Sequence, residues 1–325
     1  MRTVIILGDR GFLGTYLTTE LLKRNFEVVG IDDELSYGSV DKPYDNDTHY
    51  IKIRDDVATS NLIPLLRVTH PVAIINLAAL VGGISYFHKK PYTVLAHNSQ
   101  VVHNVFEKLV EFVAVTQLPT WILQASSSVV YEQATVFPTP ETLVDDRKIL
   151  PPKSSYGLQK LAAEYYCQSA HEQYGIDYTI FRPFNVFGVG DRDPDDKLNH
   201  VIPDLIRKIM IEGQNPVDVY GDGNQIRTYT YGGDVAKALA DIVEKRLFVN
   251  TSVNISSRNN TYSVRELVTL IGKHFGKDLD INPSDPFKWD VSKRIPSVSR
   301  LQEGLGWIPK TLIESKLNDI YEELI

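Results

Sequence analysis

The chain is poor in sulfur-containing residues and has no long apolar run. Its 325 residues include one cysteine, Cys167, and two methionines. A single cysteine excludes an intrachain disulfide framework and a cysteine-built zinc site, and it indicates a reducing compartment. No apolar run approaches the roughly 20 residues that span a bilayer, and Asp9 and Arg10 interrupt the apolar N-terminus where a signal peptide would continue. We therefore expect a cytoplasmic protein that does not bind membranes.

Basic residues are also in the minority. Lysine and arginine total 34 against 41 aspartates and glutamates, a net charge of −7. This balance argues against a nucleic-acid partner, although a local cationic pocket for a small anion remains compatible with it. The eight histidines are scattered without metal-ligand spacing, so no metal is expected.

Short β-branched runs alternate with helical patterns through the first half of the chain. This alternation predicts parallel strands joined by helical crossovers, and hence an α/β fold with a Rossmann-type doubly wound parallel sheet. After Pro183 turn signals multiply, which indicates a smaller mixed α/β lobe. We expect residues 1–182 to form the domain that contains this sheet, with a segment near 217–248 returning to it, and residues 183–325 to form the second lobe. The expected strands are 3–7, 27–31, 49–53, 72–77, 121–125 and 178–181, and the longer helices are 12–24, 92–112 and 156–174.

A glycine-rich turn follows the first expected strand. Gly8, Gly11 and Gly14 are spaced as G-x-x-G-x-x-G and lead into the first helix. Glycines there permit a tight turn and close approach to a pyrophosphate, which the helix N-terminus attracts. Asp32 ends the second strand 18 residues later, where a carboxylate can bond the adenosine ribose. This combination predicts dinucleotide binding.

The same region bears on which dinucleotide is bound. Asp32 favours NAD, because a carboxylate there repels the 2′-phosphate of NADP. Arg10, inside the turn, points the other way, since an arginine can accommodate that phosphate. We expect NAD, with NADP the less favoured cofactor.

Tyr156 and Lys160 stand four residues apart on an expected helix, and so on one face of it. A cation there can lower the pKa of the phenol, and such a tyrosine can take a proton from an alcohol during hydride transfer. A second Tyr-x-x-x-Lys match, Tyr86–Lys90, is a decoy, because Pro91 disfavours helical geometry at Lys90. The Tyr156 pair also follows a serine cluster, 126–128, at the end of the fifth strand, where ligands of such sheets bind.

With these pieces in order, the chain resembles the extended short-chain dehydrogenase/reductase family, and within it the nucleotide-sugar epimerases and dehydratases. The matching stretches run through nearly the whole chain: 8–14, Asp32, 56–57, 76–79, 126–131, 156–160, 182–188, 220–227 and 305–307.

The resemblance implies a role for each matched residue. The catalytic residues would be Ser127, Tyr156 and Lys160. The nucleotide diphosphate of the substrate would contact Asn185, Arg227 and Arg294, although Ile295-Pro296-Ser297 after Arg294 departs from the usual pattern. The cofactor would contact Gly8, Gly11, Phe12, Leu13, Gly14, Asp32, Asp56, Val57, Ala78, Ala79, Tyr156 and Lys160.

Two departures from related enzymes narrow the expected reaction. The 4,6-dehydratases place an acid where this chain has Val129, which cannot transfer a proton. The branch of 3,5-epimerases and epimerase-reductases shares the stretch 81–84, but it has a cysteine at the Val129 position and a histidine in the turn that here reads Gly188-Val189-Gly190-Asp191.

The residues that remain suit a 4-epimerase. We expect NAD-dependent epimerisation of a nucleotide-diphosphate sugar, at C4 through a 4-keto intermediate. The alternatives are a 4,6-dehydratase, a keto-sugar reductase or 3,5-epimerase on the same scaffold, and a non-catalytic NAD-binding sensor or scaffold. The family's pairing of the two long helices implies a homodimer.

Overall fold

The computed structural model describes residues 2–35, 38–191 and 200–325, and a seven-stranded parallel sheet forms its centre. The strand order is β11-β6-β5-β4-β1-β2-β3, so the chain winds outward in both directions from the neighbouring strands β1 and β4. This confirms the doubly wound sheet that the alternation of strands and helices predicts. The strands are β1 (Arg2–Leu7), β2 (Phe26–Asp32), β3 (Tyr50–Arg54), β4 (Ala73–Asn76), β5 (Trp121–Ala125), β6 (Asp177–Pro183) and β11 (Thr251–Ile255).

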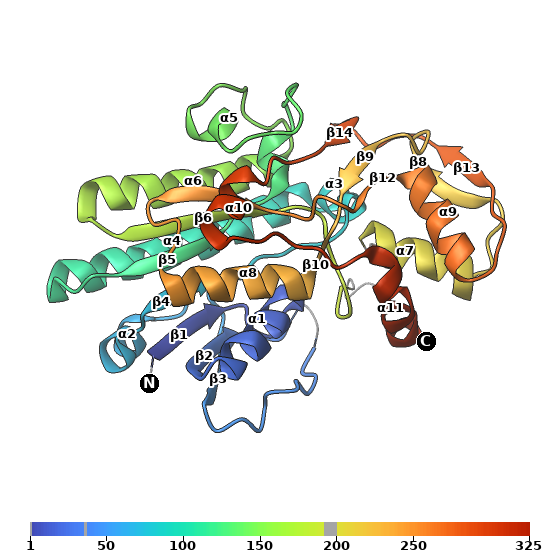
Figure 1. Ribbon diagram of the computed structural model, residues 1–325. Helices are drawn as coiled ribbons and strands as arrows, with labels where there is room; N and C mark the ends of the chain where they lie inside the picture. Colours follow the sequence, from blue (N-terminus) through green and yellow to red (C-terminus); the bar gives the residue numbers. More distant parts are fainter. Residues whose placement is uncertain (1, 36–37, 192–199) are drawn as a thin grey trace.

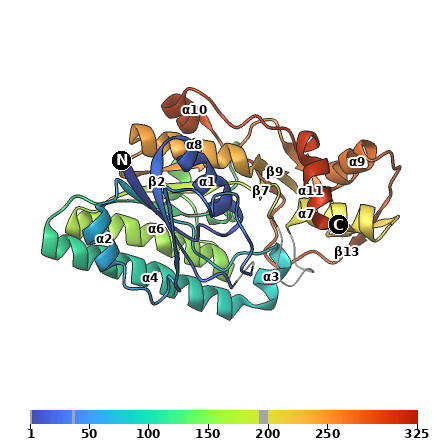
Figure 2. The ribbon, with the colours of Figure 1, turned by 90° about the horizontal axis from the view of Figure 1, so that it is seen from below.

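Helices cover both faces of the sheet (Figures 1 and 2). On one face α1 (Phe12–Lys23) packs against α8 (Gly232–Lys245), with α10 (Ser299–Leu305) beside α8. On the other face α4 (Pro91–Thr116) packs against α6 (Ser155–Tyr174), and α2 (Ile63–Thr69) contacts α4. The remaining short helices are α3 (Ile84–Lys89), α5 (Thr142–Asp145) and the single turns Ser128–Tyr131 and Ile313–Lys316. Within the described ranges, no helix has the length and apolar character needed to cross a membrane.

The seventh strand, β11, was not expected from the sequence. It pairs with β6 at the edge of the sheet, but its buried positions include Ser252 and Asn254. Asn254 accepts a hydrogen bond from the Tyr131 hydroxyl at 2.8 Å, and Ser252 donates one to Asp145 at 2.7 Å. Because these partners satisfy the polar groups, the strand is buried without an apolar sequence pattern.

A buried arginine joins the sheet to α6. Arg182 on β6 is fully buried, and its guanidinium lies 2.8 and 2.7 Å from the two carboxylate oxygens of Glu164 on α6. Ser126, at the end of β5, donates to the same carboxylate at 2.5 Å. Bidentate charged pairs fix geometry strongly. The network therefore holds the end of β5 and the face of α6 in register.

A smaller lobe with its own apolar core lies to the right in Figure 1. In one sheet β9 lies between antiparallel β12 and parallel β14, and β8 and β13 form a second pair. The lobe is therefore mixed α/β, as the sequence indicates. Its elements are β7 (Val186–Phe187), α7 (Val201–Ile206), the helical turn Arg207–Ile211, β8 (Val217–Tyr220), β9 (Ile226–Thr228), β10 (Thr230–Tyr231), β12 (Thr261–Ser263), α9 (Val264–His274), β13 (Ile281–Ser284), β14 (Lys293–Arg294) and α11 (Leu317–Leu324).

Candidate active site

A cavity of about 470 Å³ lies at the carboxyl ends of the central strands and extends into the smaller lobe. Ligands of open α/β sheets bind at this edge, where the strand order reverses. Twelve of the residues singled out by the sequence line it together: Gly8, Gly11, Phe12, Leu13, Gly14, Ala79, Ser127, Tyr156, Lys160, Asn185, Arg227 and Arg294.

Four other residues singled out by the sequence do not line this cavity. Asp56 uses its carboxylate to accept from the backbone of Ala58 at 2.8 Å, and Val57 is buried in the core. The backbone N–H of Ala78 donates to Asn76 at 3.2 Å, below the turn. Asp32 lies beside the glycine turn, where it accepts from the backbone N–H of Arg10 at 3.1 Å and of Glu34 at 2.7 Å.

The glycine turn suits an anion-binding role. Gly8 has a φ of +83°, and a Cβ on Gly14 would lie 2.1 Å from the Gly8 carbonyl oxygen, so both positions require glycine. Helix α1 begins directly after Gly11, and among the described residues no side chain caps its first turn. The unpaired N–H groups at that end attract a phosphate. The turn, the helix end and the Asp32 carboxylate therefore fit a dinucleotide.

Tyr156 lies in the first turn of α6. The Ser154 hydroxyl caps this helix by accepting from the Gly157 N–H at 3.1 Å, which fixes where the helix starts. Burial raises the pKa of Tyr156 to about 12, and the neighbouring Ser127 hydroxyl opposes this shift. Ser127 lies in the same cavity lining, two residues after the end of β5.

Lys160 lies one turn further along α6. Its Nζ donates to the Ala125 carbonyl at 3.3 Å and lies 5.7 Å from the centre of the Tyr156 ring. Burial lowers the pKa of Lys160 to about 8. The expectation that the lysine lowers the tyrosine pKa is not met by these residues alone, because burial of the phenol is the larger influence and it raises the pKa.

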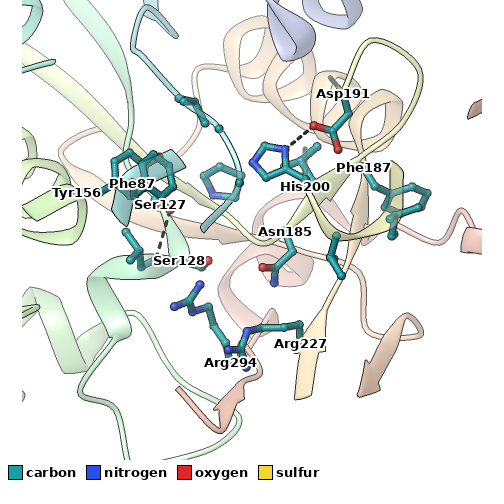
Figure 3. A pocket seen from close by; sticks show the side chains of 18 of the residues that line it. Phe87, Ser127, Ser128, Tyr156, Asn185, Phe187, Asp191, His200, Arg227 and Arg294 are labelled. Atoms are coloured by element: carbon teal, nitrogen blue, oxygen red, sulfur yellow. Dashed lines mark hydrogen bonds and ion pairs between the residues drawn. The ribbon is translucent and has the colours of Figure 1, made fainter. Parts of the chain in front are cut away.

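An aromatic side chain that the sequence did not single out covers the tyrosine. Phe87 on α3 stacks on Tyr156, with ring centres 4.0 Å apart and planes inclined by 11° (Figure 3). It comes from the decoy segment Tyr86–Lys90, of which Lys90 lies outside the helix, as the following proline predicts. Phe87, from the segment Tyr86–Lys90, therefore forms part of the cavity wall, and this segment does not place Tyr86 and Lys90 on one helical face.

Two arginines face the cavity from adjacent strands. Arg227 on β9 and Arg294 on β14 are register partners, and both side chains enter the lower part of the pocket in Figure 3. Asp290 pairs with Arg227 at 2.5 Å, whereas Nε of Arg294 is buried and has no hydrogen-bond partner among the described residues. Burial, and then the charge of Arg227, lower the pKa of Arg294 to about 10. Such incompletely neutralised cations suit a phosphate group.

A histidine that the sequence reasoning missed also lines the cavity. His200, at the start of α7, is paired through Nδ1 with the buried carboxylate of Asp191 (Figure 3). The turn 188–191 itself contains no histidine. His200, nine residues after Asp191, nevertheless lies beside this turn because it pairs with Asp191. Its position directly before the helical pattern 202–211 is a weak signal, because the sequence does not show which way that helix faces.

Comparison with known proteins agrees with this geometry. The family model described as "NAD dependent epimerase/dehydratase family" matches residues 4–256. The chain belongs to this family.

Three similar proteins extend over the whole chain. An uncharacterised UDP-glucose epimerase of Bacillus subtilis is 28% identical, with 97% of this chain and 96% of the relative covered. A GDP-L-fucose synthase of Sinorhizobium fredii is 26% identical over 100% of this chain and 96% of the relative. Among solved structures, a UDP-N-acetylglucosamine 4-epimerase of Methanobrevibacter ruminantium has a TM-score of 0.83 and 26% identity, with 99% and 98% covered.

Proposed function

We propose that this member of the family is an enzyme that epimerises a nucleotide-diphosphate sugar at C4, with NAD as its cofactor. One observation carries the proposal: Tyr156, Ser127 and Lys160 and the arginine pair Arg227–Arg294 line one cavity together with the glycine turn. The similar UDP-sugar epimerases favour UDP as the nucleotide.

The residues that line the cavity would have different roles in binding and in proton transfer. Arg227 and Arg294, with Asn185 beside them, would hold the diphosphate. Tyr156 would accept the proton of the C4 hydroxyl while Ser127 donates to the oxygen, and the same tyrosine would return the proton after the keto sugar turns over. Lys160 would stabilise the phenolate. NAD supplies the hydride acceptor and its positive charge when bound in the glycine turn.

The arginine pair also explains how an acidic protein would bind an anionic substrate. The net charge of −7 repels a diphosphate at a distance, so a local positive potential is needed. Arg227 is buried and Arg294 is half-buried at the cavity wall, with its Nε buried, and there their field is screened less than at the open surface. We place cofactor binding in residues 1–182 and substrate recognition in the smaller lobe, within residues 183–325. From this second range α8 and β11 return to the large sheet and belong to the cofactor domain.

The finer assignment of NAD over NADP rests on Asp32. Its carboxylate is held at the glycine turn by two backbone N–H groups, in a position to meet the ribose hydroxyls and to repel a 2′-phosphate.

His200 favours a second candidate reaction. A histidine paired with a buried carboxylate has the chemistry to act as a general acid or base, and a 3,5-epimerase or keto-sugar reductase needs one beside the sugar. The GDP-L-fucose synthase relative fits this alternative. Val129 weighs against it, because that position supplies no acid, and this also disfavours a 4,6-dehydratase. A sensor or scaffold is disfavoured because Ser127, Tyr156 and Lys160 line one cavity.

The test is conversion of UDP-glucose and UDP-N-acetylglucosamine without added reductant, read by NMR at C4. We expect a C4 epimer of unchanged mass, whereas a dehydratase would give a product lighter by one water, and a reductase would consume NADH.

Tyr156→Phe should lower the rate on the order of 10²- to 10⁴-fold, with NAD affinity retained. Tyr165→Phe, exposed on the same helix, is the matched control. Activity of Tyr156→Phe within tenfold of wild type would exclude the proposed base.

We further propose that the protein is a homodimer in the cytoplasm. The faces of α4 and α6 that point away from the sheet carry exposed aromatic and aliphatic side chains, among them Tyr92, Val115 and Tyr166, which suit helix pairing. Cys167 is buried and free, as a reducing compartment allows. A monomer in sedimentation analysis at micromolar concentration would contradict the dimer.

A further inference from the structure

Arg10, in the glycine turn, is an arginine at the place where a 2′-phosphate would arrive. Its backbone N–H donates to the Asp32 carboxylate at 3.1 Å, so the residue borders the expected ribose site. From the sequence it counts toward NADP, because an arginine there can bind the extra phosphate. The structure shows a side chain that is 3% exposed and engaged along its whole guanidinium.

Each nitrogen of that guanidinium already has a protein partner. Nη1 donates to Oδ1 of Asp45 at 2.5 Å, and Nη2 donates to Oδ2 of Asp45 at 3.1 Å and to the Val40 carbonyl at 2.6 Å. Nε lies 3.0 Å from Oε1 of Glu34, which is an ion-pair contact without hydrogen-bond geometry. The fork that would grip a phosphate is therefore occupied by two carboxylates and a carbonyl.

These partners are not easily displaced. The side chain of Glu34 is fully buried and is also paired with Lys52, so releasing Arg10 would leave this buried carboxylate with one cation instead of two. The hydrogen bond from Arg10 holds the pKa of Asp45 below its ordinary value, which keeps that carboxylate charged. Around the ribose position Asp32, Glu34 and Asp45 outnumber the cations Arg10 and Lys52, and a 2′-phosphate would add about two more negative charges.

We propose that Glu34 and Asp45 are specificity-determining residues that exclude the 2′-phosphorylated cofactor by sequestering Arg10. In this arrangement Asp32 binds the ribose, and the Glu34–Arg10–Asp45 cluster removes the cation that would otherwise accept NADP. The inference rests on the dinucleotide part of the proposed function and is independent of which sugar reaction occurs.

The test compares the affinities for NAD and NADP of the full-length protein by calorimetry. The informative quantity is the ratio of the two dissociation constants for each variant, because a loosened loop weakens both cofactors alike and leaves the ratio unchanged. In E34Q/D45N we expect the preference for NAD to fall roughly tenfold to hundredfold, as Arg10 gains charged hydrogen bonds to the phosphate. Adding R10M to that background should restore the original ratio.

Two further variants keep the result interpretable. D45N alone touches a carboxylate that is 24% exposed, so it should fold even if the double variant does not, and it should shift the ratio about threefold to tenfold. D41N removes an exposed charge from the same loop without contacting Arg10, and it should leave the ratio unchanged.

Three results would overturn the inference. They are equal affinity of the wild-type protein for both cofactors, an unchanged ratio in D45N and E34Q/D45N while D32N shifts it, and a shifted ratio that persists after R10M. Failure to bind either cofactor would instead contradict the dinucleotide site itself. A protein that binds NAD selectively but epimerises no sugar would leave this inference standing and overturn only the proposed reaction.

Discussion

Arginines lie beside the glycine turn and in the smaller-lobe end of the cavity, but their surroundings are opposite. At the glycine turn Arg10 is paired with two carboxylates, Glu34 and Asp45. At the substrate end Arg227 and Arg294 lie side by side with one paired carboxylate, Asp290, between them. The pKa of Arg10 is raised by its hydrogen bond to Asp45, whereas burial and the neighbouring cation lower the pKa of Arg294. The first arginine is held by its carboxylates, and we propose that the second pair binds the diphosphate of the substrate.

This difference shows that the number of carboxylates paired with a buried arginine distinguishes an arginine that stabilises the fold from one that is available to an anionic ligand. Arg182 follows the pattern of Arg10: Glu164 and Asp145 pair with it, and it joins β6 to α6. A buried cation with enough carboxylates stabilises the fold, because removing it leaves unpaired charges. A buried cation with too few carboxylates around it creates a local positive potential, which an anionic ligand can neutralise.

Removing both substrate-end arginines should have the largest effect. Arg227→Gln with Arg294→Gln is expected to weaken UDP binding roughly 10²- to 10⁴-fold, because two sets of charged hydrogen bonds are lost. Calorimetry with UDP and with NAD separates the ends: NAD affinity should not change. Arg258→Gln, which changes an exposed arginine between β11 and β12, is the matched control. UDP binding as tight as in the control would break the comparison.

The same comparison predicts opposite effects on stability. Arg10→Met should lower the free energy of unfolding by about 3–5 kcal/mol, because the fully buried Glu34 loses a partner. Arg294→Met should leave stability unchanged or raise it, since no described carboxylate pairs with Arg294. Urea denaturation of both variants measures this. Equal losses of unfolding free energy in the two variants would show that Arg10 and Arg294 contribute to stability in the same way.

Lys160 extends the comparison to the cavity floor. Burial lowers its pKa from 10.5 to about 8, so between these values the unfolded chain binds a proton that the folded protein does not. Stability therefore rises with pH across this window. Lys160→Met should be more stable than wild type by about 3 kcal/mol at pH 7, and the difference should vanish near pH 10.5. Denaturation curves at pH 7, 9 and 10.5 check this. A difference that does not vary with pH would contradict it.

The smallest expected effect concerns Asp290. Its carboxylate occupies Arg227, so a diphosphate must compete with it for the guanidinium. Asp290→Asn keeps the acceptor for the Val291 N–H and should tighten UDP binding about threefold to tenfold, in the range of a single partly exposed charge pair. Calorimetry at low salt would detect it. Weaker binding would mean that Asp290 positions Arg227 for the substrate instead of competing with it.

Much of the framework could be predicted from the sequence. Runs such as Thr3–Leu7 and the helix that places Tyr156 and Lys160 on one face follow from local periodicity and capping, which a single segment contains. β11 could not, because its buried Ser252 and Asn254 depend on partners more than 100 residues away.

The site divides in the same way. The glycine turn carries its own signal, whereas Phe87 and His200 become site residues through the placement of α3 and α7 relative to β5. The role of Arg10 could not be predicted, because it depends on ion pairs with Glu34 and Asp45. These residues lie 24 and 35 positions further along the chain, and the sequence does not specify the path of their loop. Charge neutralisation is a property of the assembled fold, so counting charges along the chain does not reveal it.

The central claim is that Tyr156 and Ser127 epimerise a nucleotide sugar at C4 without touching the protons at C3 and C5. The direct test is to run the reaction on UDP-glucose in deuterium oxide, without added reductant, and to record the proton NMR spectrum of the products. The account predicts a mixture of C4 epimers with no deuterium on any sugar carbon, because hydride leaves and returns within the cavity. Deuterium at C3 or C5 would contradict it and would assign the reaction to proton exchange through His200.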